Sequence, residues 1–313
     1  MSYILLNKFR GAFLGSLAHQ NLKTLELDSQ SSFYSHSLSE AIKPQWFLGL
    51  QQEIVSIMPR QENLVNAWFE TVFELLLTKN LLKTANCSVF VLLSLPIIIY
   101  YCDYWLYLTE YIEQKGQKFA KSSEEITAIL VWCYGVRLAL RGELISSNLT
   151  HCFIQEAQVK QQKTTLWLEK LKISYFEGWS LSQLLTELSS PDNEQIPLSL
   201  SCFLNNAEDF ELIIQQASFL EEDFTLVTAL SGVLGGAYNG LTGIALNWRN
   251  SNQNQNYYQQ LIIQIEEMTK EWLGIDGAAN IDQASCIITA PQILQPRSSL
   301  KVISQEEYRS KFI

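Results

Sequence analysis

The chain has 313 residues, of which 47% are hydrophobic and 17% are charged. This balance excludes intrinsic disorder and low-complexity architecture, and the length suits one large domain or two ordinary ones. The formal net charge is −10, which repels phosphate backbones and anionic lipids, and no dense basic run offsets it. We therefore expect neither a nucleic-acid partner nor a membrane partner.

The N-terminal residues lack the long apolar region and the small-residue cleavage site of a signal peptide. The chain has only three histidines, and no two cysteines have CxxC spacing, so a zinc site is not expected. We predict a cytoplasmic protein whose cysteines are buried free thiols rather than disulfides. The cysteines are Cys87, Cys102, Cys133, Cys152, Cys202 and Cys286.

The most apolar stretch of the chain runs from residue 89 to residue 102. It is interrupted by Ser94 and Pro96 and is followed by Asp103, whereas a membrane span needs about 20 apolar residues. It therefore predicts a buried helix with a proline break rather than a membrane anchor.

Apolar residues recur with helical spacing over residues 125–142, and Gly142 supplies a stop signal. Similar patterns predict helices over residues 65–82, 164–175, 210–219 and 257–273. No linker is long enough to separate two domains. We predict an all-α fold with a single domain over residues 1–275. Residues 276–313 differ in character and are expected to be an irregular or strand-like extension packed on the body.

Glycine and alanine form two stripes with helical spacing. Each glycine inside a helix costs about 1 kcal/mol relative to alanine, unless close packing offsets it. Small residues on two helix faces allow two backbones to approach closely. The stripes therefore predict a tightly packed helix pair, either without a ligand or with a cavity at its ends. The first stripe is Gly11, Gly15 and Ala18, and the second is Ala229, Gly232, Gly236, Gly240 and Gly243.

Five segments of the chain are notable for their order and their separations. They are residues 11–15 (GAFLG), 196–203 (IPLSLSCF), 209–217 (DFELIIQQA), 232–240 (GVLGGAYNG) and 247–249 (NWR). Their order and separations resemble those of the ADP-ribosylglycohydrolase family, helical hydrolases that remove ADP-ribose from proteins. The resemblance covers about residues 8–250. It implies an orthogonal bundle of helices in a single domain.

The resemblance also implies a two-magnesium centre, held in the family by Asp and Thr side chains from an early and a late motif. Magnesium is a hard cation that prefers oxygen ligands. In the late motif Asp223 is retained, but Thr225 replaces the second Asp and Leu226 replaces the closing Thr. The early motif aligns with residues 47–50 (FLGL), which carry no side-chain oxygen, and Gln20 replaces an Asp.

We therefore expect no cofactor and a degenerate metal site at which Asp223 alone could hold magnesium weakly. The acidic run that ends at Asp223 is also typical of a helix N-terminus, where the helix dipole favours negative charge. If activity survives, Asp223 and Glu222 are the candidate catalytic residues. The predicted ligand cleft contains His19, Gln20, Phe47, Phe224, Thr225 and Gly232.

Three functions remain open from the sequence. The first is a catalytically degenerate homologue with a binding or regulatory role toward a protein partner or an ADP-ribose-like ligand. The second is an active hydrolase of ADP-ribose or a related N-glycosidic linkage, with a site rebuilt around Asp223 and magnesium as its cofactor. The third is a helical scaffold for protein interactions.

Overall fold

The computed structural model describes residues 2–17, 87–120, 122–143, 162–188, 194–219 and 224–249, together with residues 263, 265, 266, 269 and 272. Every regular element in these ranges is a helix, which confirms the prediction of an all-α class. No helix in the described ranges is long and apolar enough to cross a membrane.

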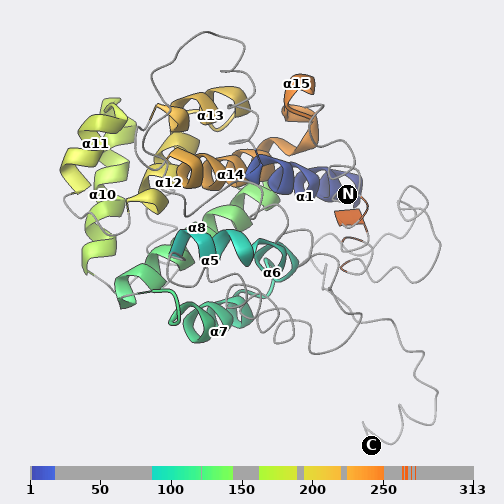
Figure 1. The fold of residues 1–313 in the computed structure, drawn as a ribbon, viewed down its shortest axis with the longest axis horizontal. Coiled ribbons are helices and arrows are strands. Elements are labelled where there is room, and N and C mark those ends of the chain that lie inside the picture. The colour runs from blue at the N-terminus through green and yellow to red at the C-terminus, as the bar shows by residue number, and fades with distance from the viewer. Residues whose placement is uncertain are drawn as a thin grey trace, which may run out of the picture.

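Two neighbouring helices, α1 and α14, lie side by side and organise the rest of the fold (Figure 1). Helices α12 and α13 pack on α14, and α8 contacts α14, α12 and α7. Helices α10 and α11 lie at one flank, where α10 contacts α12. In chain order the helices are α1 (Ser2–Ser16), α5 (Cys87–Leu93), α6 (Leu95–Tyr100), α7 (Trp105–Gly116), α8 (Ser123–Arg141), α10 (Gln162–Glu177), α11 (Leu181–Leu188), α12 (Gln195–Asn205), α13 (Phe210–Ser218), α14 (Phe224–Gly243) and α15 (Leu246–Arg249).

Helix α8 has clear signals at both ends. The Ser122 hydroxyl accepts a hydrogen bond from the backbone N–H of Glu125 and caps the N-terminus. At the other end Gly142 has a φ of 71°, a left-handed conformation that favours glycine, and its N–H bonds the carbonyl of Ala139. The helix predicted over residues 125–142 is thus confirmed.

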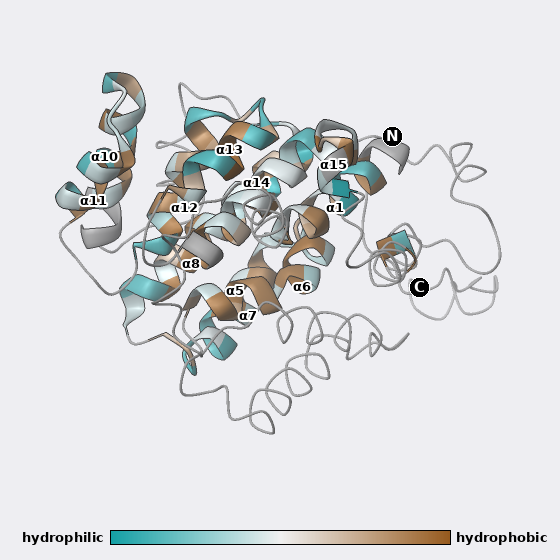
Figure 2. Ribbon diagram, turned by 45° about the horizontal axis from the view of Figure 1, so that its top comes forward, coloured by the Kyte–Doolittle hydropathy of each residue, from teal (hydrophilic) through white to brown (hydrophobic). Residues whose placement is uncertain are grey.

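The apolar stretch forms the two short helices α5 and α6, whose residues are all buried. Ser94 interrupts them, and Pro96 lies in the first turn of α6, where its missing N–H leaves no helical bond unmade. Figure 2 shows both helices coloured as hydrophobic, and both contact α8. The predicted buried helix with a proline break is therefore confirmed.

The predicted helices over residues 164–175 and 210–219 correspond to α10 and α13. The helix predicted over residues 65–82 and the extension over residues 276–313 lie outside the described residues. Of the helix predicted over residues 257–273, the structure describes only helical positions 263, 265, 266, 269 and 272.

The glycine stripes meet each other across the contact between α1 and α14. A Cβ atom added at Gly11 would collide with the Gly236 carbonyl oxygen and lie 2.6 Å from the Gly240 carbonyl carbon. A Cβ at Gly15 would collide with the carbonyl group of Gly232. The backbones themselves form this contact, so the predicted tightly packed helix pair is confirmed.

The prediction that the second stripe continues smoothly to Gly243 is wrong. Gly240 has a φ of 69° and a ψ of −179°, which kinks α14. A Cβ at Gly243 would meet the side chain of Asn239 rather than α1, at 2.5 Å from its Cβ. The stripe therefore ends at the kink, where a Cβ at Gly240 would lie 2.5 Å from Nδ2 of Asn7. Ala18 of the first stripe lies outside the described residues.

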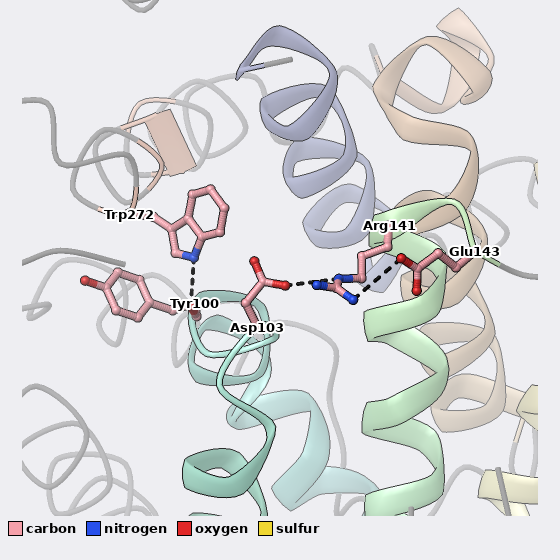
Figure 3. Close-up of polar contacts among 5 residues, drawn as sticks. All are labelled: Tyr100, Asp103, Arg141, Glu143 and Trp272. Atoms are coloured by element: carbon pink, nitrogen blue, oxygen red, sulfur yellow. Dashed lines mark hydrogen bonds and ion pairs between the residues drawn. The ribbon is translucent and has the colours of Figure 1, made fainter. Parts of the chain in front are cut away.

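Two of the described positions near residue 270, Glu266 and Trp272, contact helices of the body, and Figure 3 shows the contact of Trp272 with Tyr100. The Trp272 indole N–H donates to the Tyr100 carbonyl oxygen at 2.9 Å, and the Trp272 ring meets the Phe9 ring edge-on at 5.9 Å. Glu266 pairs with Arg10 of α1. In a separate contact, Arg141 Nε lies 3.1 Å from Asp103 Oδ1, and Arg141 Nη1 lies 3.5 Å from Glu143 Oε1.

Four cysteines lie in the described ranges, and all four are buried thiols outside any disulfide, as predicted: Cys87, Cys102, Cys133 and Cys202. Burial raises the pKa of Cys102 and of Cys202 to about 12. Burial also raises the pKa of Cys133. Cys152 and Cys286 lie outside the described residues.

Candidate functional site

Most of the predicted site lies outside the described residues. This applies to His19, Gln20, Phe47, Glu222 and Asp223. Phe224 and Thr225 form the start of α14, and only their backbone is described. The proposed roles of these residues therefore stay predictions.

The surroundings of two predicted positions are described: Leu226 of the late motif and Gly232 of the predicted ligand cleft. Leu226, which the resemblance aligns with the closing Thr of the late motif, is 5% exposed and belongs to the apolar core. Gly232 lies inside the helix contact, where an added Cβ would be 2.7 Å from the Gly15 carbonyl carbon and 3.2 Å from Cδ1 of Ile214. At these two positions, the described structure contains packed backbone and apolar side chains.

The described residues contain no group of three or more His, Cys, Asp or Glu side chains placed to hold one metal ion. This finding covers only the described ranges, so it leaves the surroundings of Asp223 untested. Elsewhere on the surface there is an open groove whose lining residues are all described.

The groove lies between the end of α10 and the outer face of α13, and its volume is about 650 Å³. Side chains from the end of α12 complete it. Four aromatic rings and four carboxamides dominate the lining, and none of the lining residues is charged. The lining residues are Tyr175, Phe176, Gly178, Trp179, Asn205, Asn206, Leu212, Gln215, Gln216 and Phe219.

Helix α13 presents one face to the core and another to the groove. Its N-terminus is capped by the Asp209 carboxylate, which accepts hydrogen bonds from the backbone N–H groups of Glu211 and Leu212 at 3.0 and 3.1 Å. The core face packs on α14, where the absence of a side chain at Gly235 makes room for Ile213. Leu212, Gln215, Gln216 and Phe219 recur at helical spacing and line the groove.

The opposite wall is formed where α10 ends. Gly178 has a φ of 66°, and a Cβ there would meet nothing within 4 Å, so backbone conformation rather than space favours glycine. The turn is closed by the Trp179 backbone N–H, which donates to the Ser174 carbonyl at 3.0 Å. The Trp179 indole N–H donates to Glu177 Oε2 at 2.8 Å. This turn places the Trp179 ring beside Tyr175 and Phe176 in the lining.

The carboxamides give the groove hydrogen-bonding capacity without charge. Asn206 Nδ2 donates to Gln216 Oε1 at 2.6 Å, which joins α12 to α13. The pair leaves one amide oxygen, on Asn206, and one amide NH₂, on Gln216, able to bind a ligand. Glu211 Oε1 accepts a hydrogen bond from Gln215 Nε2 at 3.4 Å. Carboxylates therefore lie at the rim, while the lining itself offers no cation to a phosphate group.

Sequence reasoning did not identify this groove. The pattern over residues 210–219 predicts a helix and nothing about its outer face, and the helix predicted over residues 164–175 ends where the aromatic cluster of residues 175–179 begins. One signal was available, because Leu212 and Phe219 are large apolar residues on the side of α13 opposite its core face. The partner wall could not be inferred, because it comes from a helix far away in sequence.

No family model matches this chain, and no curated protein matches it. The resemblance to the ADP-ribosylglycohydrolases therefore rests on the order and spacing of the residues quoted above.

Proposed function

We propose that this chain is a non-catalytic binding or regulatory protein built on a helical body like that of the ADP-ribosylglycohydrolases. The observation that carries the proposal is the burial of Leu226 in the apolar core. In the resemblance, this position belongs to the metal-ligating motif. An apolar side chain there supplies no oxygen ligand.

The contact between α1 and α14 supports the architectural part of the proposal. The two glycine-containing segments that carry much of the resemblance, residues 11–15 and 232–240, pack on each other through their backbones. Such a contact explains why both segments have glycine at helical spacing. The N-terminal and C-terminal segments that carry the resemblance therefore lie next to each other in the structure.

The loss of chemistry follows from the ligand count. A two-metal hydrolytic site places its ions about 3.5–4 Å apart and needs several oxygen ligands to fix them. Asp223 is the only Asp retained in the late motif, and residues 47–50 of the early motif have no side-chain oxygen. We therefore expect a protein that binds a partner or an ADP-ribose-like ligand without hydrolysing it.

The test combines a hydrolysis assay with thermal unfolding. We expect no release of ADP-ribose from an ADP-ribosylated protein, with or without magnesium. We also expect magnesium alone to leave the melting temperature unchanged, because an ion that does not bind the folded state cannot stabilise it.

Asp223→Ala is the informative variant, and Glu208→Ala, at an exposed position before α13, is its acidic control. Release of ADP-ribose by the native chain that is lost in Asp223→Ala and kept in Glu208→Ala would contradict the proposal. It would instead support the alternative of an active hydrolase.

A further inference from the structure

The open groove between α10 and α13 has a composition that suits a particular class of partner. We infer that it binds an extended, proline-rich peptide segment that carries a flanking Arg or Lys. The inference rests on the proposed binding function and deepens it by naming the class of partner. Three observations carry it: exposed aromatic rings, uncharged hydrogen-bonding groups, and carboxylates at the rim.

Exposed apolar side chains concentrate at the groove. Nine large hydrophobic residues are exposed in the described ranges, and four of them line it. Phe219 is 81% exposed and Phe176 is 62% exposed, although an aromatic ring gains most from burial. A patch of this kind with a polar border is typical of a protein-interaction site.

The hydrogen-bonding groups of the groove match a proline-rich backbone. Proline has a carbonyl acceptor and no N–H, so a polyproline II segment needs donors from its partner. The Gln216 amide NH₂ is available for this, and the Tyr175 hydroxyl and the Asn205 amide make no hydrogen bond in the described part of the chain. Pyrrolidine rings can pack on the aromatic rings between these donors, as in other aromatic grooves that recognise such peptides.

The rim supplies charge complementarity. Glu177 and Glu211 are exposed carboxylates, and each accepts a hydrogen bond from a lining residue, Trp179 and Gln215 respectively. The whole chain carries a net charge of −10. A basic residue next to the proline-rich segment would therefore be attracted to this rim, and an acidic residue would be repelled.

Other ligand classes fit less well. A nucleotide needs a cation or a cluster of backbone N–H groups for its phosphates, and no lining residue is charged. A neutral saccharide could use the carboxamides, but the most exposed rings are phenylalanines without a polar group. A proline-rich peptide can pack its pyrrolidine rings on the exposed phenylalanine rings and accept hydrogen bonds from the amide and hydroxyl donors of the groove.

Isothermal titration calorimetry tests the inference with the full chain and a synthetic peptide of one arginine followed by about eight prolines. We expect saturable binding that weakens with salt, because part of the attraction is electrostatic. Replacing the arginine by glutamate should weaken binding. Glu177→Gln combined with Glu211→Gln should remove most of the difference between the two peptides.

The aromatic contact is tested with Phe219→Ala, which we expect to weaken binding about tenfold. Leu106→Ala is the matched control, because Leu106 is 75% exposed on α7, far from the groove (Figure 1). Both side chains are so exposed that neither variant should shift the unfolding midpoint measurably, as is usual for surface substitutions.

Several outcomes would overturn the inference. These are no binding of the proline peptide, equal binding of a glycine–serine peptide of the same length, or unchanged affinity in Phe219→Ala. Binding of maltotriose with the same dependence on Phe219 would assign the groove to saccharides. A homodimer that Phe219→Ala dissociates would assign it to a second copy of the chain. Each of these results leaves the hydrolysis test of the proposed function unaffected.

Discussion

At the scale of single residues, burial determines the chemistry of the cysteines. Removal from water disfavours the thiolate, which is why the pKa values of Cys102 and Cys202 rise to about 12. For Cys102 the neighbouring Asp103 carboxylate adds to this effect, and Arg141 and Arg137 partly oppose it. Such thiols remain protonated and unreactive at neutral pH. They are core residues rather than nucleophiles.

These pKa values predict how stability depends on alkaline pH. Between the ordinary thiol pKa of about 9 and the folded value of about 12, the unfolded state loses the thiol proton and the folded state keeps it. The contribution of these thiols to the free energy of unfolding should therefore be constant well below pH 9 and should fall above it. The expected loss is about 1.4 kcal/mol per buried thiol at one pH unit above the ordinary value.

Urea unfolding measured at several pH values between about 8 and 11 checks this prediction, with Cys202→Ala as the variant. The variant should be less stable at neutral pH, because its side chain is fully buried, but it should lose less stability as pH rises. Equal slopes for the native chain and Cys202→Ala would contradict the burial argument.

At the scale of elements, the contact between α1 and α14 depends on the absence of side chains. The carbonyl groups of Gly232 and Gly236 occupy the space that Cβ atoms would need at Gly15 and Gly11. A backbone cannot yield as a flexible side chain can. These glycines are therefore fixed by packing, whereas Gly142 and Gly178 are fixed by their positive φ angles.

We predict that Gly15→Ala destabilises the protein by about 1–3 kcal/mol, even though alanine is the better helix former. The added methyl group collides with the Gly232 carbonyl and would force the two helices apart. Denaturant unfolding monitored by circular dichroism measures the change.

Gly116→Ala on α7 is the control, because a Cβ there meets only side-chain atoms, the nearest at 3.0 Å on Ile126. It should lose clearly less stability than Gly15→Ala. A Gly15→Ala protein as stable as this control would show that the helices do not pack backbone to backbone.

At the scale of the whole molecule, positions near residue 270 connect to the N-terminal helix and to α6. Ile265, Thr269 and Trp272 are buried and recur at spacings of four and three, which places them on one helix face. Trp272 is 1% exposed and is held by the Tyr100 carbonyl and the Phe9 ring. These contacts join parts of the chain that are more than 170 residues apart.

We predict that Trp272→Ala destabilises the protein by about 3–5 kcal/mol, because it removes the largest buried side chain of this segment. Trp272→Phe keeps an aromatic ring and loses the hydrogen bond to Tyr100, so its cost should be smaller. Ile263→Ala, at a 56% exposed position, should leave stability within about 0.5 kcal/mol. Thermal unfolding ranks the three variants, and equal melting temperatures would contradict this docking.

Local signals in the sequence predicted much of the described fold. Helix α8 was predictable because its periodicity agrees with its stop at Gly142, and the α5–α6 segment because its apolar stretch was too short for a membrane span. The kink at Gly240 was not predictable, because helical spacing continues through it and only the φ angle reveals the break.

The sequence alone determined the helical class of the described residues, the burial of the four described cysteines and the pairing of the two glycine stripes. These properties depend on residue type and on spacing along a single segment. Helical periodicity and the burial of apolar residues can therefore be predicted from the sequence. Only the tertiary structure decided where the second stripe ends and that α10, α12 and α13 form an uncharged aromatic groove. A groove of this kind depends on which helices pack together and which of their side chains meet. No local sequence pattern specifies that packing.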